Sequence, residues 1–287
     1  MHHAERGDPV TATTHDATMR ETAARLSGKR ESGEPSINER LAMRQQPSSR
    51  PIGFHHWSDL TFLHWRLPAT EIARLIPAEL TLDTWDGDAW VGLVPFFMSG
   101  VRPWWSPAMP GVSNFAETNV RTYVHHDGLG PGVWFFSLDA ASSLAVRLAR
   151  WRWNLNYFRA TMSVTGSRDS IAYSSHRLWP QPSGGMTDVE IQVCERGNEG
   201  NESRTAQPGT LEFFLVERYV MYMQRRNGGL RRGHVWHQPY PLHEVKLTSC
   251  RETLLAHSGI TVDGSPCHVA YSPGVDVKIY APFNLSD

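Results

Sequence analysis

Short strand-like segments, separated by glycine, aspartate or proline, dominate this chain and constrain its fold more than any other feature. Their β-branched and aromatic residues favour strands over helices. The segments are residues 60–65, 89–98, 119–124, 133–138, 160–164, 171–177, 189–194, 219–223, 230–236, 243–248 and 275–280. Helical spacing predicts only short helices, at 69–75, 141–151 and 251–257. We therefore expect a sheet-dominated α+β domain, a barrel or sandwich with an interior cavity.

The first 50 residues differ in composition from the rest of the chain. They contain no Phe, Trp, Tyr or Cys, and they hold 15 charged residues. Such a segment buries too little apolar surface to offset the entropy lost on ordering. We predict a disordered N-terminal extension at 1–50, with transient helix near 19–26 and 37–43, and one domain at 51–287. The polar stretch 195–209 is expected to be a surface loop.

The overall charge excludes several classes of partner. The 287 residues include 28 Lys and Arg against 29 Asp and Glu, a net charge of −1. Nucleic-acid and anionic-membrane partners rely on a basic surplus, so we expect neither. No apolar run reaches the length of a membrane span, and the N-terminus lacks a signal-peptide core, which makes the cytoplasm the expected location. Three widely spaced cysteines indicate neither a disulfide framework nor a thiolate zinc site.

Polar side chains alternate along residues 117–123. Successive residues of a strand point to opposite faces, so Glu117, Asn119, Arg121 and Tyr123 would share one face. A carboxylate, an amide, a guanidinium and a phenol in one row suit a polar-lined cavity. They suit an exposed strand edge equally well, because antiparallel sheets often solvate one face.

Several ordered motifs in residues 51–283 resemble one known family. They are FAETNVRTYV, PGVWFFSLDA, the AR…LNY…A segment, LEFFLVERYVMY, VWHQPYPL and YSPGVDVKIYAP. Together they resemble the YqjF-like family of uncharacterised bacterial proteins, which is assigned to the acetoacetate decarboxylase-like fold. The resemblance implies a cone-shaped β-barrel that encloses a cavity, with a few short helices.

The resemblance does not imply the decarboxylase reaction. Acetoacetate decarboxylases hold a Schiff-base lysine in a Gly-Arg-Glu…Pro-Lys-Lys segment, and a gap-free match places Arg150 under its arginine and Tyr157 under the imine-forming lysine. Glu117 falls under the glutamate that enters the decarboxylase pocket. A tyrosine cannot form the imine that serves as electron sink. The only lysines beyond the extension, Lys246 and Lys278, alternate with apolar neighbours and are expected to face solvent.

The other patterns in the sequence carry little chemistry. The pairs His55-His56 and His125-His126, and the segment 234–237, would direct their histidines to opposite faces of a strand. We therefore expect no metal site, and no phosphate-binding loop or dinucleotide motif indicates a cofactor. The segment 217–219 is interpreted as structural, with an ion pair rather than a catalytic group.

The sequence supports three functional hypotheses. The first is binding of a small organic molecule in the barrel cavity, with Asn119, Arg121, Tyr123 and Arg150 as ligand-binding residues. The second is a lyase, hydratase or isomerase without an imine, acting on a carbonyl or carboxylic acid with Glu117 as acid or base and Tyr157 as proton donor. The third is a non-catalytic protein whose aromatic surface recruits a partner. The sequence is also compatible with a homo-oligomer.

Overall fold

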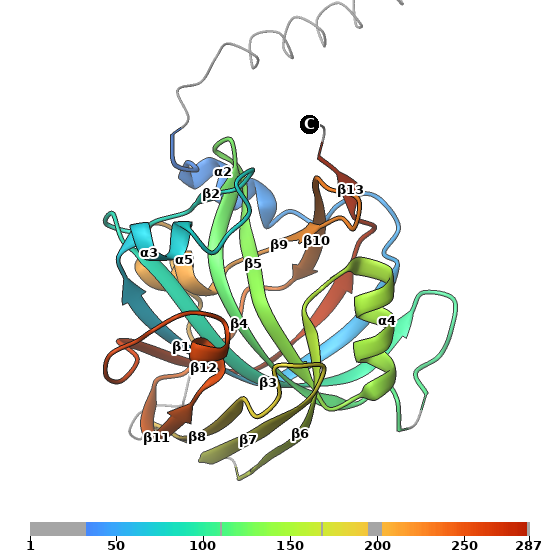
Figure 1. The fold of residues 1–287 in the computed structure, drawn as a ribbon, viewed down its shortest axis with the longest axis vertical. Coiled ribbons are helices and arrows are strands. Elements are labelled where there is room, and N and C mark those ends of the chain that lie inside the picture. The colour runs from blue at the N-terminus through green and yellow to red at the C-terminus, as the bar shows by residue number, and fades with distance from the viewer. Residues whose placement is uncertain (1–32, 110, 168, 195–202, 286–287) are drawn as a thin grey trace, which may run out of the picture. The chain divides into compact units, whose positions relative to one another are not determined.

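The computed structural model describes residues 33–109, 111–167, 169–194 and 203–285. Residues Glu34–Asp287 form one compact unit, shown in Figure 1. Strands dominate it, and the helices are short, which confirms the sheet-dominated α+β class. No helix in the described part of the chain is both long and apolar enough to cross a membrane.

All strands belong to a single sheet. In chain order they are β1 (Gly53–Leu67), β2 (Thr81–Leu82), β3 (Ala89–Pro103), β4 (Phe115–His126), β5 (Leu129–Ala140), β6 (Tyr157–Gly166), β7 (Ser170–Trp179), β8 (Met186–Val193), β9 (Val220–Gln224), β10 (Leu230–His237), β11 (Val245–Glu252), β12 (His268–Ile279) and β13 (Phe283–Asn284). The helices are α2 (Ile37–Met43), α3 (Ala69–Ala73), α4 (Ser143–Trp153), α5 (Leu211–Val216) and α6 (Leu254–His257).

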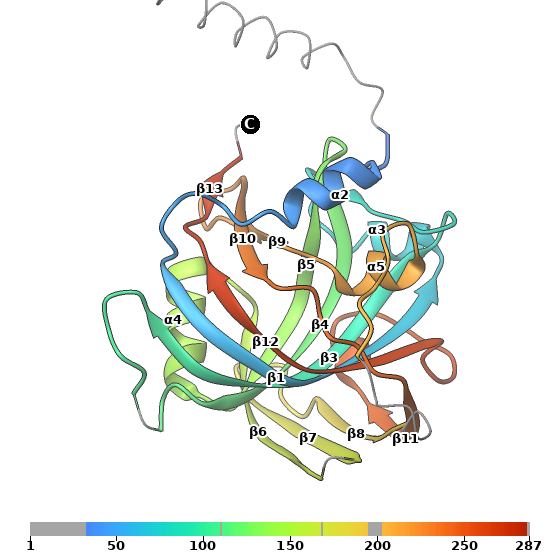
Figure 2. The same ribbon diagram turned by 180° about the vertical axis from the view of Figure 1, so that it is seen from behind.

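Seven strands pair with one another in a closed ring, which we call the circuit. From β5 they run through β9, β10, β12, β1, β3 and β4, and β4 pairs again with β5. Strands β6, β7, β8 and β11 continue from β5 as a separate arm, which lies across one end of the circuit in Figures 1 and 2. Most pairings are antiparallel, but β5 runs parallel to both β6 and β9.

Two large apolar clusters occupy opposite faces of the circuit strands. Phe62 of β1 packs in a cluster that also receives side chains from β3, β4, β10, β12 and α5. The neighbouring Leu63 belongs to a second cluster, which includes Ile171 and Ile191 of the arm. Adjacent residues of a strand thus enter different clusters, as the two-residue period requires. The arm therefore buries the outer face of the circuit, while α5 packs on the inner one.

The N-terminal boundary lies earlier than the sequence predicted. Residues 1–32 lie outside the described residues, but 34–50 belong to the compact unit and include helix α2. Ser36 and Glu39 form a capping box at its start. Arg40 bonds both carboxylate oxygens of Asp83 at 2.7 Å, and Leu41 packs on the first cluster. The prediction of a disordered segment is therefore wrong for 34–50, because a buried ion pair and helix capping replace the aromatic packing that the segment lacks.

Candidate functional site

The polar row on β4 is buried. Glu117, Asn119 and Arg121 are 3%, 5% and 8% exposed. Tyr123 is fully buried and packs in the same cluster as Phe62. Val120, between them in sequence, belongs to the opposite cluster. The four polar residues therefore share the inner face of the circuit, and the alternative of an exposed strand edge does not apply.

Glu117 and Tyr157 meet on this inner face. The Tyr157 hydroxyl donates a hydrogen bond to Glu117 Oε2 at 3.0 Å, although the residues are 40 positions apart. The parallel pairing of β5 with β6 brings Tyr157 beside Leu138, whose other neighbour is Asn119. Burial raises the pKa of Glu117 to about 8; the Tyr157 hydrogen bond lowers it less than burial raises it, and the charge of Asp139 adds to the increase. Glu117 therefore carries a proton at neutral pH.

Arg121 lies deeper in the same row. Its Nη2 donates to the Leu215 carbonyl of α5 at 3.1 Å, and its guanidinium lies 5.6 Å from the centre of the Phe62 ring. Its Nε and the Oδ1 of Asn119 are both buried, with no hydrogen-bond partner among the described residues. A buried polar atom without a partner costs about 1–3 kcal/mol, so a ligand that bonds these two atoms would be stabilised there.

Tyr123 completes the row and is held by a directional chain of hydrogen bonds. Its hydroxyl lies 2.7 Å from both the Leu215 carbonyl and His64 Nε2, and a carbonyl can only accept. Tyr123 therefore donates to Leu215, and His64 donates through Nε2. Burial lowers the pKa of His64 well below its usual value, with further lowering by His268 and Arg121, so the ring is neutral and its Nδ1 accepts from His268 Nδ1 at 3.0 Å.

The groups around this chain of hydrogen bonds hold the His64 ring in place. A Cβ at Gly92 would lie 3.0 Å from the imidazole, so the absence of a side chain there makes room for it. On the far side, His268 Nε2 lies 3.9 Å from Glu212, which Arg204 also binds. The Leu215 carbonyl accepts from both Tyr123 and Arg121 and so fixes the guanidinium in place.

Arg150 does not join the row. It is half-buried, its Nη1 donates to the Tyr157 carbonyl at 2.8 Å, and its guanidinium lies about 6 Å from the rings of Phe158 and Trp179. The arginine therefore positions the backbone of Tyr157 from outside. The expected convergence of Arg150 with Glu117 and Arg121 is not what the structure has, because its side chain runs along the start of β6 instead of crossing the sheet.

Sequence reasoning missed the aromatic groups near Arg121. His237 stacks on Tyr219 with ring centres 4.5 Å apart and contacts Tyr240 at 4.4 Å, and Tyr240 lies edge-on to Phe62. Burial, with a smaller contribution from Arg121, lowers the pKa of His237 to about 4. Trp57 adds an indole nitrogen that has no partner in the described part of the chain. The only sequence signal was the density of aromatic residues in 234–240.

The remaining expectations concern the lysines, the histidines and the segment 217–219. Lys246 is exposed, whereas Lys278 is half-buried and contacts Gln46 and Trp236. The described residues contain no group of three or more side chains arranged to hold a metal ion. Arg218 forms its ion pair with Asp83 at 2.6 Å, not with Glu217.

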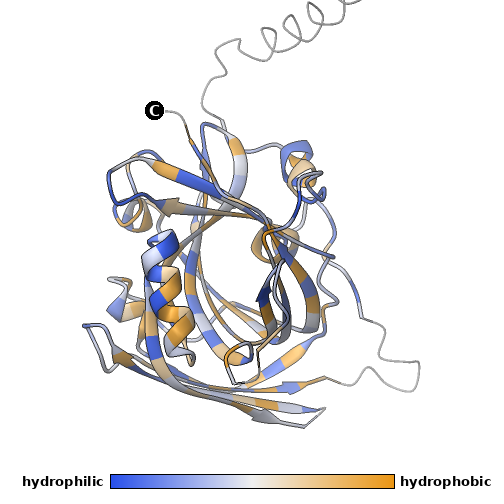
Figure 3. Ribbon diagram, turned by 90° about the vertical axis from the view of Figure 1, so that its right-hand side faces the viewer, coloured by the Kyte–Doolittle hydropathy of each residue, from blue (hydrophilic) through white to orange (hydrophobic). Residues whose placement is uncertain are grey.

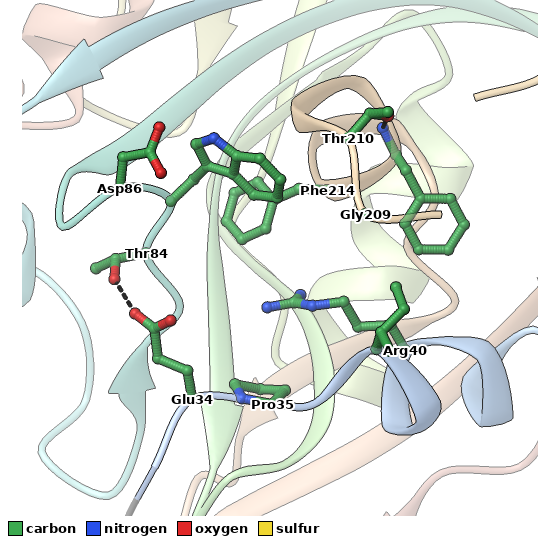
Figure 4. A pocket seen from close by; sticks show the side chains of 11 residues that line it. Glu34, Pro35, Arg40, Thr84, Asp86, Gly209, Thr210 and Phe214 are labelled. Carbon is green, nitrogen blue, oxygen red and sulfur yellow. Dashed lines mark hydrogen bonds between the residues drawn. The ribbon is translucent and has the colours of Figure 1, made fainter. Parts of the chain in front are cut away.

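A separate pocket of about 280 Å³ lies between α2, the turn after β2 and the start of α5. Figure 4 shows Arg40 and Phe214 around it, with Glu34 bonded to Thr84 at its edge. None of the predicted site residues lines it. The arginine of this pocket, Arg40, is already paired with Asp83.

Several solved structures resemble this fold. An acetoacetate decarboxylase-like enzyme from Sphingomonas wittichii RW1 aligns with a TM-score of 0.54 at 10% identity, over 83% of this chain and 95% of that one. The acetoacetate decarboxylase of Legionella pneumophila aligns with a TM-score of 0.53 at 11% identity, over 90% and 98%. The enduracididine biosynthesis enzyme MppR, solved in complex with pyruvate, aligns with a TM-score of 0.51 at 11% identity, over 85% and 94%. At these identities the likeness concerns the fold alone.

The sequence comparisons are more specific. The uncharacterised protein YqjF of Bacillus subtilis strain 168 is 34% identical over 224 residues, which cover 78% of this chain and 88% of YqjF. A family model described as an uncharacterised conserved protein matches residues 55–276, which include the whole β4 row and Tyr157. The expected resemblance is thereby confirmed, and the chain belongs to this family, DUF2071, within which YqjF is its relative.

Proposed function

We propose that the chain binds a small organic molecule on the inner face of the strand circuit, which we interpret as a cone-shaped barrel with an interior site. The observation that carries the proposal is the pair of buried polar atoms without partners, Arg121 Nε and Asn119 Oδ1, beside the protonated Glu117. Small-molecule sites are mostly apolar walls with a few convergent polar groups. Phe62 and Tyr240 supply such walls here.

The polar groups define the class of ligand. Arg121 offers a fixed, charged N–H donor, which favours a carboxylate or a polarised carbonyl oxygen. Asn119 offers an acceptor, which favours a hydroxyl or amine on the same molecule. Glu117, with its proton, can donate to a second ligand oxygen. We therefore propose an oxo or hydroxy carboxylic acid, and MppR, whose solved complex contains pyruvate, supports this choice by analogy of fold.

Binding tests this proposal most directly. The probes are pyruvate, acetoacetate and their hydroxy-acid counterparts, titrated by calorimetry and by thermal shift. We expect at least one probe to bind the unmodified protein, and Asn119→Leu and Arg121→Met to weaken that binding at least tenfold. Asn156→Leu is the matched control, because Asn156 is exposed and lies outside the row. Unchanged affinity in Asn119→Leu and Arg121→Met would contradict the proposal.

The alternative is an enzyme that works without an imine, on a carbonyl or carboxylic acid. The contact between Tyr157 and Glu117 favours this reading, because it joins a hydroxyl donor to a carboxyl group with a pKa near neutrality. Tyr157→Phe distinguishes a catalytic role of the hydroxyl from a role in ligand binding. Loss of turnover with unchanged affinity supports catalysis, while loss of affinity alone supports binding.

A non-catalytic partner-binding protein is the third hypothesis, and a homo-oligomer in the cytoplasm is compatible with all three. A non-catalytic partner-binding protein would leave the β4 row without a ligand of any kind. The same titrations test it, because a partner-binding protein would show no affinity that depends on Asn119 or Arg121.

A further inference from the structure

Helix α4 presents two different faces. Val146 and Ala149 are buried against the sheet, and the helix begins at the Ser142 cap. With about 100° between successive residues, Leu144, Leu148 and Trp151 fall together on the opposite side. Their exposed fractions are 54%, 48% and 67%. Apolar side chains of this size are normally buried, so a row of three on one helix marks a contact surface.

Arginines border this row on both sides. On the same helical projection, Arg147 lies on one flank of the row and Arg152 on the other. Both are exposed. Figure 3, in which α4 faces the viewer, shows hydrophilic and hydrophobic residues alternating along the exposed side of the helix. We call Leu144, Arg147, Leu148, Trp151 and Arg152 the α4 face.

The charge of the α4 face is uncompensated. Helix α4 contains no Asp or Glu, and Arg147 and Arg152 form no ion pair within the described residues. The turn between β9 and β10 adds Arg226, whose Nη2 bonds the Arg150 carbonyl at 3.1 Å near the end of the helix. The whole chain has a net charge of −1, so the positive charge is a local property of this side.

A second exposed apolar segment lies on the same side of the molecule. The turn that follows β3 carries Trp104 and Trp105, which are 44% and 71% exposed. Figures 1 and 2 show this turn projecting on the side of the sheet that α4 covers. Arg50 stacks on the Trp104 ring at 3.6 Å, so this segment too combines indole with guanidinium.

We propose that the α4 face binds the surface of an anionic phospholipid bilayer. An interfacial helix buries an apolar strip at the level of the acyl chains, while flanking arginines reach the lipid phosphates and tryptophans lie at the headgroups. The α4 face has this arrangement. A second copy of the chain fits it less well, because a twofold contact across α4 would place Arg147 and Arg152 against the same arginines of the other copy. The expectation of no membrane partner rested on the charge of the whole chain, whereas this proposal concerns one face.

Vesicle sedimentation with the full chain tests the proposal. The probes are vesicles of phosphatidylcholine alone and vesicles of phosphatidylcholine with phosphatidylglycerol. We expect binding to the anionic vesicles only, weakened by added salt. Arg147→Gln with Arg152→Gln should lower the partition coefficient roughly 30-fold. Leu148→Gln with Trp151→Gln should lower it by a similar factor while keeping the helix charge.

Matched controls separate the α4 face from the rest of the surface. Leu129→Gln removes a leucine that is also 48% exposed, and Arg251→Gln removes an exposed arginine elsewhere. Neither should change vesicle binding. Absence of binding to anionic vesicles at low salt, or equal losses in the control variants, would overturn the proposal. A concentration-dependent dimer that Leu148→Gln disrupts, without vesicle binding, would overturn it in favour of a second copy.

Discussion

Glu117 is the residue whose charge depends most on its surroundings. It is buried, its one hydrogen-bond donor is the neutral hydroxyl of Tyr157, and the nearest carboxylate to influence it is Asp139. Arg177 binds both oxygens of Asp139 from the outer face, so that arginine is not available to Glu117. The raised pKa of Glu117 therefore follows from the architecture and not from a flexible contact.

Replacing Glu117 by Gln should change how stability depends on pH. Folded Glu117 keeps its proton up to a pKa of about 8, whereas the unfolded chain releases it near 4.5. The unmodified protein therefore loses stability as pH rises through this window, by at most about 1.4 kcal/mol per pH unit, and Gln cannot ionise. Urea unfolding at pH 5 and pH 8 should show Glu117→Gln gaining stability relative to the unmodified protein at the higher pH.

The exposed Glu190 provides the control for this measurement. Glu190→Gln should leave the difference between pH 5 and pH 8 as it is in the unmodified protein. A constant stability difference between Glu117→Gln and the unmodified protein at both pH values would show that Glu117 titrates normally.

The Tyr157 hydroxyl should keep the pKa of Glu117 from rising further. Its hydrogen bond lowers the pKa of Glu117, although burial outweighs it. Tyr157→Phe removes the donor, so the pKa of Glu117 should rise further. Carbon NMR of the Glu117 carboxyl group across a pH series measures the change directly, and Tyr173→Phe, which leaves the row intact, is the control. A lower pKa in Tyr157→Phe would contradict the assignment of the hydroxyl as donor.

The buried carboxylate of Asp83 links helix α2 to the sheet. Burial alone would raise the pKa of Asp83, but Arg218 and Arg40 outweigh burial and lower it. Arg218 also donates to the Phe214 carbonyl at 2.7 Å and lies over the rings of Tyr123 and Phe214. One carboxylate thus connects α2, the turn after β2 and the segment that follows α5.

Removing Arg40 should loosen this connection without unpairing Asp83 completely. We expect Arg40→Met to cost about 1–3 kcal/mol, because Asp83 loses a charged partner but keeps Arg218. Asp83→Ala should cost more, about 3–5 kcal/mol, because it leaves the charge of Arg218 buried and unpaired. Urea unfolding at neutral pH measures both, with the exposed Arg74→Met as the control. Equal stability of Arg40→Met and the control would contradict a structural role for α2.

The local sequence patterns were sufficient for most strands but not for α5. Strands with regular alternation, such as β4 and β7, lie where the two-residue period predicts them. Residues 211–216 form a helix whose last four residues are all buried, so the segment shows no polar face and no helical period. Its carbonyl at Leu215 holds Arg121 and Tyr123, which explains why the partners of the row could not be predicted. His64 lies 59 positions from Tyr123, and only the pairing of β1, β3 and β4 brings them together.

At the scale of the whole molecule, the chain has an acetoacetate decarboxylase-like fold. The gap-free sequence match predicts that Tyr157 occupies the position of the decarboxylase lysine. Glu117, Asn119 and Arg121 lie in one row on β4, and long-range strand pairing brings Tyr157 to Glu117, so this arrangement depends on the integrity of the sheet. Imine chemistry, in contrast, requires one specific amine at that site. In the proposed function, the fold sets the position of the site and the side chains decide its chemistry.

Acetoacetate with borohydride should leave no reduced adduct on a lysine of the folded unit. Lys246 is exposed on β11, and Lys278 bonds Gln46 on the outside of β12, whose neighbour Val277 packs in the inner cluster. Neither lysine belongs to the β4 row, and the Tyr157 phenol, whose pKa burial and Glu117 raise well above its usual value, stays protonated and forms no imine. Intact-mass and peptide mass spectrometry should therefore find no adduct and no carbon dioxide should be released, with an acetoacetate decarboxylase as the positive control. A borohydride-trapped imine at Lys246 or Lys278 that depends on Arg121 would show instead that a lysine enters the site and that the chemistry is that of the decarboxylases.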